Sequence, residues 1–60
     1  MLGNSIPSTT IPHPDGWRID VYDGRDQPFT ARDDHGDVYK FCAYRDDAEK
    51  WVKKAVLRRR

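Results

Sequence analysis

The sequence lacks features that define several large protein classes. It has a single cysteine, Cys42, so no disulfide within the chain can brace the fold. It has no apolar run near the roughly 18 residues that a membrane-spanning helix needs. It also has no glycine-rich loop of the kind that binds phosphate groups. These absences exclude a disulfide scaffold, a transmembrane helix and a nucleotide-binding loop.

Groups that could carry catalysis or bind a metal ion are also few. Cys42 would need a base, but a strand rise of about 3.3 Å per residue places His35 roughly 20 Å away. Zinc takes four ligands of the Cys or His type, whereas the chain has one cysteine and two histidines. The acidic loop around Asp33, Asp34 and Asp37 lacks the spacing of a calcium-binding EF-hand. We therefore expect no enzymatic activity, no metal, no cofactor and no small-molecule substrate.

The beginning of the chain has the composition of a disordered segment. The first sixteen residues contain three of the four prolines and no aromatic residue. Such a segment cannot bury enough apolar surface to offset the loss of chain entropy on folding. We expect a disordered lead over residues 1–15, one domain over residues 16–58, and a basic tail at residues 59–60.

Three segments of this domain alternate apolar and polar residues with the period of a β-strand. They read WRIDVY (residues 17–22), PFTAR (28–32) and DVYKFCAY (37–44). Asp23-Gly24 and His35-Gly36 lie between them and suit hairpin loops. In the third segment the charged Lys40 indicates the solvent side, which predicts that its neighbours Tyr39 and Phe41 face the core. The pattern predicts a three-stranded antiparallel meander.

The last segment changes to a helical period. Apolar residues recur at the spacing of one helix face, and Asp46 with Glu49 has the spacing of a capping box. We expect a helix from Asp47 to Leu57 or Arg58 that packs across the sheet, giving an α+β fold of the βββα type. The predicted core is Trp17, Ile19, Val21, Phe29, Ala31, Tyr39, Phe41, Ala43, Ala48, Trp51, Val52, Ala55 and Val56.

Charge is distributed unevenly along the chain, although the net charge is +1. Residues 1–49 contain five basic residues and all ten acidic ones, whereas residues 50–60 contain six basic residues and no acid. The two parts therefore carry −5 and +6. A basic end of this kind either complements the dipole of the helix or contacts an anionic partner.

The face of the predicted sheet opposite the core is a candidate DNA-reading surface. Strands can enter the major groove, where arginine pairs with guanine and threonine contacts the methyl group of thymine. The candidate base-reading residues are Arg18, Thr30, Arg32 and Lys40. The candidate phosphate contacts near the end of the helix are Lys54, Arg58, Arg59 and Arg60.

The segment FCAYRDDAEKWV leads from the last predicted strand into the helix. Its Phe41, Ala48, Glu49 and Trp51, together with the order of three strands and a helix, resemble the N-terminal arm-type DNA-binding domain of tyrosine-recombinase integrases. The resemblance implies a sheet packed against one helix and DNA contacts on the sheet face, at the four base-reading positions named above.

Two functions from different classes are consistent with these observations. The first is a small, non-enzymatic DNA-binding accessory or regulatory protein of a phage or another mobile element. The alternative is a protein-interaction module whose acidic loops face a basic partner, with Tyr22, Val38 and Tyr44 as an apolar anchor. Neither function needs a membrane, and the lone thiol suggests the reducing cytoplasm.

Overall fold

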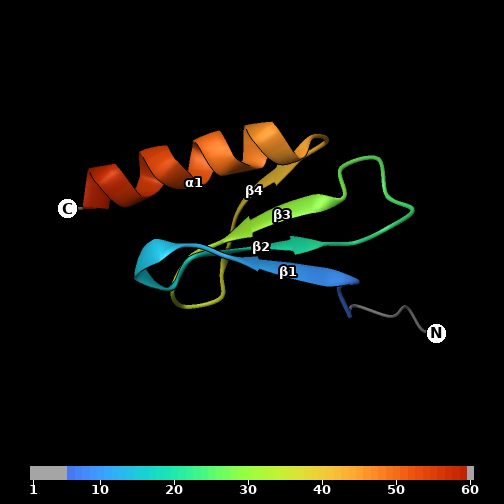
Figure 1. Ribbon diagram of the computed structural model, residues 1–60, viewed down its shortest axis with the longest axis horizontal. Helices are drawn as coiled ribbons and strands as arrows, with labels where there is room; N and C mark the ends of the chain where they lie inside the picture. The colour runs from blue at the N-terminus through green and yellow to red at the C-terminus, as the bar shows by residue number, and fades with distance from the viewer. Residues whose placement is uncertain (1–5, 60) are drawn as a thin grey trace.

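The computed structural model describes residues 6–59, with side chains described through residue 58, and shows one sheet covered on one face by one helix (Figure 1). The α+β class is confirmed. Neighbouring strands are antiparallel in the order β1-β2-β3-β4, and α1 packs mainly on β3 and β4. We call the uncovered side of the sheet the open face. The elements are β1 (Thr9–Pro12), the 3-10 helix η1 (Pro14–Gly16), β2 (Arg18–Val21), β3 (Phe29–Arg32), β4 (Val38–Cys42) and α1 (Arg45–Arg59).

The sheet has a strand that the sequence pattern did not predict. β1 pairs with β2, and Ile11 lies opposite Ile19 and packs against the core. The prolines do not interrupt this ladder, because Pro12 ends an edge strand and Pro14 begins η1. The predicted disorder over residues 1–15 is therefore wrong for residues 6–15, and residues 1–5 lie outside the described part. The meander has four strands rather than three.

The two central strands have the predicted faces. Ile19 on β2 and Ala31 on β3 are paired, and both are fully buried beneath the helix. The predicted loops are also present. Gly24 and Gly36 adopt φ values of +85° and +86°, which lie in the left-handed region that glycine enters without steric cost.

The helix has the predicted face but begins earlier than expected. Ala48, Val52 and Ala55 are buried at the i, i+4, i+7 spacing. The helix starts at Arg45, so Asp46 lies within its first turn. The predicted capping box is not formed by the side chain of Glu49, which instead accepts a hydrogen bond from Arg45 Nε at 2.8 Å.

The predicted faces of β4 are right for Val38 and Tyr39 but wrong from Lys40 onward. Cys42 lies opposite Phe29 and is buried in the core, whereas Phe41 points to the open face and is 47% exposed. Ala43, predicted to face inward, is also exposed. The helix begins only three residues after β4, so the end of this strand lies close beneath its first turns. Small side chains such as Cys42 and Ala48 fit there, and the larger Phe41 would hold the helix away.

A β-bulge within β4 changes once more which side of the sheet the side chains of this strand face. Ala31 pairs with Lys40 but Arg32 pairs with Val38, which leaves Tyr39 as the extra residue. The Tyr39 ring turns to the helix side, where its centroid lies 5.2 Å from that of Trp17 and 6.5 Å from that of Trp51. Lys40 also lies on the helix side of the sheet and not on the open face.

Candidate nucleic-acid interface

The predicted site residues are divided between the two sides of the sheet. Arg18, Thr30 and Arg32 lie on the open face, as expected. Lys40, Lys54 and Arg58 lie on the helix side. The side chain of Arg59 and the whole of Arg60 lie outside the described part. One flat surface therefore cannot present the whole predicted set to a duplex.

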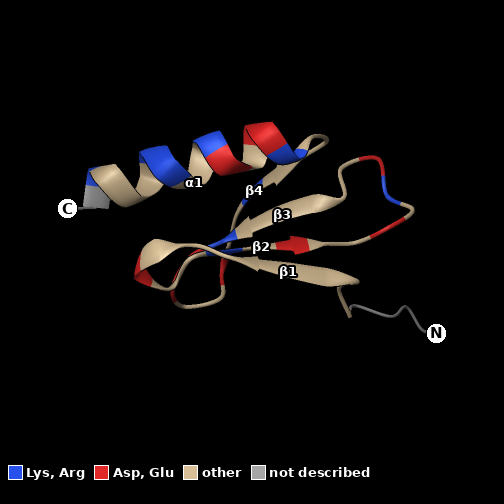
Figure 2. Cartoon of the chain, in the orientation of Figure 1, with Lys and Arg blue, Asp and Glu red and all other residues tan. Residues whose placement is uncertain are grey.

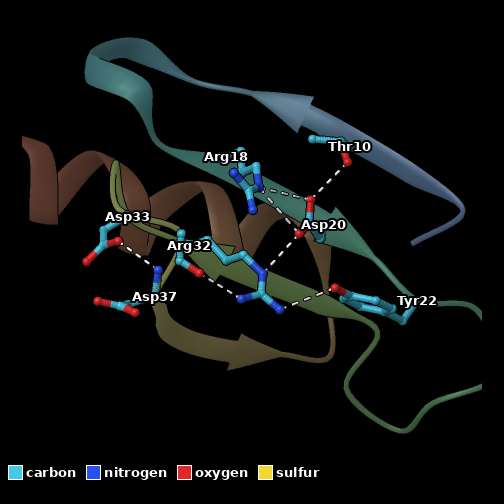
Figure 3. A network of polar contacts seen from close by, with 8 residues as sticks. Thr10, Arg18, Asp20, Tyr22, Arg32, Asp33 and Asp37 are labelled. Carbon is cyan, nitrogen blue, oxygen red and sulfur yellow. Dashed lines mark hydrogen bonds and ion pairs between the residues drawn. The ribbon is translucent and has the colours of Figure 1, made fainter. Parts of the chain in front are cut away.

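On the open face a buried carboxylate holds both arginines (Figure 3). Asp20 is 3% exposed and accepts hydrogen bonds from Arg32 Nε at 3.0 Å, Arg18 Nε at 3.4 Å and Thr10 Oγ1 at 2.9 Å. These donors come from three adjacent strands. The network therefore ties the middle of the sheet together through side chains as well as through the backbone ladder.

Each nitrogen of the Arg32 guanidinium has a partner within the protein. Beyond Asp20, its Nη1 donates to Gly36 O at 2.8 Å and its Nη2 to Tyr22 OH at 3.3 Å. The hydrogen bond to Tyr22 is the largest cause that raises the pKa of Arg32, against the opposing effect of burial. All three nitrogens have partners, which use three of the five N–H groups and hold the guanidinium in place within the protein.

Thr30 is fully buried, and its Oγ1 has no hydrogen-bond partner. It lies between Asp20 and Phe41 on the neighbouring strands. A side chain without exposed surface cannot touch the methyl group of a thymine. Of the three open-face candidates, only Arg18 keeps substantial exposed side-chain surface, at 42%.

Acidic loops flank the open face at both ends (Figure 2). One of these carboxylates is structural. Asp33 Oδ1 accepts hydrogen bonds at 2.9 Å from the backbone N–H groups of His35 and Asp37, which fixes the turn between β3 and β4. The exposed members are Asp34 and Asp37 at this end and Asp23 and Asp26 at the other. They disfavour the approach of a phosphate backbone along the sheet.

Two lysines converge on one aromatic ring on the helix side. Lys40 Nζ lies 4.6 Å from the centroid of the Trp51 ring, and Lys54 Nζ lies 5.8 Å from it. The Trp51 ring is 38% exposed, although the sequence predicted a core residue. β4 supplies one lysine and α1 supplies the other, so the cluster exists only in the folded chain.

Further cations extend this cluster along the helix. Lys50, Lys54 and Arg58 are exposed at the i, i+4, i+8 positions, which share one side of a helix. We call Lys40, Lys50, Trp51, Lys54 and Arg58 the basic patch. Acids occupy only the first turns of α1, as Figure 2 shows, and none follows Glu49. Glu49, the last of these acids, accepts a hydrogen bond from Arg45, which lowers the pKa of its carboxyl group.

The sequence carried a signal for this patch. Trp51, Lys54 and Arg58 have the i, i+3, i+7 spacing of one helix side, next to the buried face. No comparable signal places Lys40 beside them, because alternation alone does not say which face of β4 turns to the helix. The patch could therefore be predicted from the sequence only in its helical half.

The remaining reactive groups form no site. Cys42 is buried, which raises the pKa of its thiol, and nearby Asp47 raises it further. His35 Nε2 lies 3.8 Å from Asp34 Oδ1 on the surface. Over residues 6–59, no group of three or more His, Cys, Asp and Glu side chains could hold a metal ion. Within the same residues, no helix has both the length and the apolar character to cross a membrane.

A small apolar groove lies on the opposite side of the helix from the basic patch. It has a volume of about 220 Å³ and is lined by His13, Pro14, Val52, Lys53, Val56 and Leu57. His13 Nε2 is buried at this place and has no hydrogen-bond partner. Only one side chain in the lining, Lys53, carries a full positive charge at neutral pH, so the groove lacks the density of cations found on the patch.

Comparisons with known proteins leave the resemblance to integrase arm-type domains as a prediction. No protein-family model, no curated protein and no solved structure matches the chain.

Proposed function

We propose that this protein is a small non-enzymatic nucleic-acid-binding protein of accessory or regulatory type, and that it binds through the basic patch instead of the open face. The observation that carries the proposal is the convergence of Lys40 and Lys54 on the exposed ring of Trp51. We further propose that it acts in the cytoplasm, because its single thiol is free.

The chemistry of the patch favours the phosphate backbone over base edges as its target. Lysine is a compact point charge on a flexible stem, whereas base reading relies mainly on the planar fork of arginine. The patch contains three lysines and one arginine, and the two arginines on the open face are held by Asp20. We therefore propose binding to duplex DNA with little sequence preference.

The salt dependence of binding tests this proposal. Neutralising four phosphates, one for each cation of the patch, predicts a slope of log affinity against log salt of about −3.6. The double variant Lys40→Ala/Lys54→Ala removes two contacts and is expected to halve that slope. At about 0.1 M salt the same loss corresponds to roughly 60-fold weaker binding. Fluorescence anisotropy with a labelled mixed-sequence duplex measures both quantities.

Lys53→Ala is the matched control, because it removes one cation from the same helix on the side away from the patch. We expect it to weaken binding less than the loss of one patch lysine does, because its side chain lines the apolar groove instead of the patch. An unchanged affinity in the double variant, or a wild-type slope near zero, would contradict the proposal.

A further inference from the structure

Exposed apolar side chains gather along one edge of the molecule. β4 is the last strand of the sheet, so its outer side has no neighbouring strand among the described residues. Among residues 6–58 the only other exposed large apolar side chains are Ile6 and Leu57. An apolar edge of this kind can pair with a strand of another chain. The residues along this edge are Val38, Tyr39, Phe41, Tyr44 and Trp51, with exposures of 44%, 38%, 47%, 71% and 38%.

The opposite edge of the sheet is less suited to pairing. β1 has four residues and ends at Pro12, which has no N–H group to donate. β4 has five residues and no proline. β4 is therefore the edge to which another strand would add.

The hydrogen-bond alternation of the sheet shows which backbone groups of β4 point outward. Tyr22 N–H donates to Pro28 O at 2.8 Å, so these two residues form a hydrogen-bonded pair between β2 and β3. In an antiparallel ladder every second pair is hydrogen-bonded, so Asp20 and Thr30 form the next such pair. The backbone groups of Phe29 and Ala31 therefore point to β4, where they form hydrogen-bonded pairs with Cys42 and Lys40. The N–H and C=O groups of Phe41, which lies between those partners, point away from the sheet.

We propose that β4 pairs antiparallel with β4 of a second copy of this chain, about a twofold axis at Phe41. The product is a continuous eight-stranded sheet with both helices on the same face, formed by a self-complementary surface. Because α1 lies over β3 and β4, a strand spacing of about 4.8 Å places the two helix axes roughly 10 Å apart. That separation is the ordinary distance for packed helices. It turns the Trp51 sides of the two helices toward each other, so pairing and nucleic-acid binding compete for the basic patch.

Charge selects this register over the neighbouring one. An axis at Lys40 would set the two lysines directly opposite each other, which is unfavourable. An axis at Phe41 avoids this contact, because it sets Lys40 opposite Cys42 of the second copy.

The ends of the paired strands are complementary as well. Antiparallel pairing brings the beginning of one β4 to the end of the other, so Asp37 lies near Arg45 of the second copy. The exposed Val38 likewise lies near Tyr44 of the second copy. The two Phe41 rings meet at the axis on the open face, which covers side chains that are exposed in the monomer.

Charge-swapped variants test the proposed dimer without nucleic acid. A negative result would therefore overturn the dimer and leave the proposed function standing. Two strands and two helix flanks form a small interface, below about 1,200 Å², and we expect weak association. Sedimentation from about 10 µM to about 1 mM is expected to show a monomer–dimer equilibrium for the wild type. Phe41→Glu and Phe41→Lys should each remain monomeric, and their equimolar mixture should recover the dimer.

Recovery in the mixture separates loss of pairing from loss of folding, since two misfolded chains would not form a defined dimer. Isotope-filtered NOEs between Phe41 rings of differently labelled wild-type chains give a readout that needs no substitution. A wild type that stays monomeric over the whole concentration range would overturn the proposal. So would a mixture that sediments as monomer, or an NOE pattern without contacts between copies.

Discussion

Replacing Asp20 by alanine is expected to leave the protein largely unfolded at 25 °C. Asp20 is almost fully buried and accepts hydrogen bonds from Arg18, Arg32 and Thr10 on three strands. Alanine removes the negative charge and leaves the half-buried Arg32 without its main ionic partner. Breaking a buried pair by removing one member costs about 3–5 kcal/mol. The partly exposed arginines recover some hydration, so we expect about 3 kcal/mol here.

A domain of sixty residues has only a few kcal/mol of stability to lose. Urea denaturation followed by circular dichroism measures the effect. Asp20→Asn, which keeps an acceptor oxygen and the side-chain volume, should cost less. Asp26→Ala, in an exposed loop, should change the free energy of unfolding by no more than about 0.5 kcal/mol. Equal stability of Asp20→Ala and Asp26→Ala would mean that the network contributes little.

Replacing Trp17 by alanine is expected to be at least as damaging, at about 4 kcal/mol. Trp17 is 3% exposed and its ring lies edge-on to that of Tyr39, 5.2 Å between centroids. Alanine leaves a large cavity between the sheet and the helix, where the few remaining core side chains are too small to refill it. Thermal unfolding followed by tryptophan fluorescence and circular dichroism reports the loss.

The same substitution at Trp51 is the matched comparison. Trp51 is partly exposed and lies at the edge of the core, so we expect a cost of about 1–2 kcal/mol. Trp51→Ala should therefore stay folded and remain usable in binding measurements. Similar losses at the two positions would indicate that Trp51 belongs to the core and not to a binding surface.

The fold could be predicted where a single physical rule decides the structure. Ile19 and Ala31 follow the two-residue period, and Ala48, Val52 and Ala55 follow the helical one. The rule failed at β1, because three prolines gave residues 1–16 the composition of a disordered segment. Pro12 ends β1 and Pro14 begins η1, and both positions are compatible with order. Composition averages over a segment, whereas the effect of a proline depends on its exact place.

The candidate site was harder to predict, because it depends on which face of β4 turns to the helix. Strict alternation from Lys40 placed that residue on the open face and Phe41 in the core. In the structure Lys40 pairs with Ala31 and Phe41 with Thr30, which reverses both, and a bulge then turns Tyr39 to the same side as Lys40. Bulges depend on contacts between distant residues, here Tyr39 with Trp17 and Trp51, which no local pattern contains. The arginines were placed correctly, but burial of Asp20 between them could not be read from alternation.

Chemical-shift mapping of isotope-labelled protein during titration with a mixed-sequence DNA duplex tests whether the basic patch binds DNA. We expect the amide signals of Lys40, Lys50 and Lys54 and the indole N–H of Trp51 to shift at low salt, and to shift less near physiological salt as screening increases. The indole N–H of Trp17 serves as the internal control and should not move. Shifts centred on Arg18 and Arg32, or no shifts at all, would contradict a nucleic-acid interface on the basic patch.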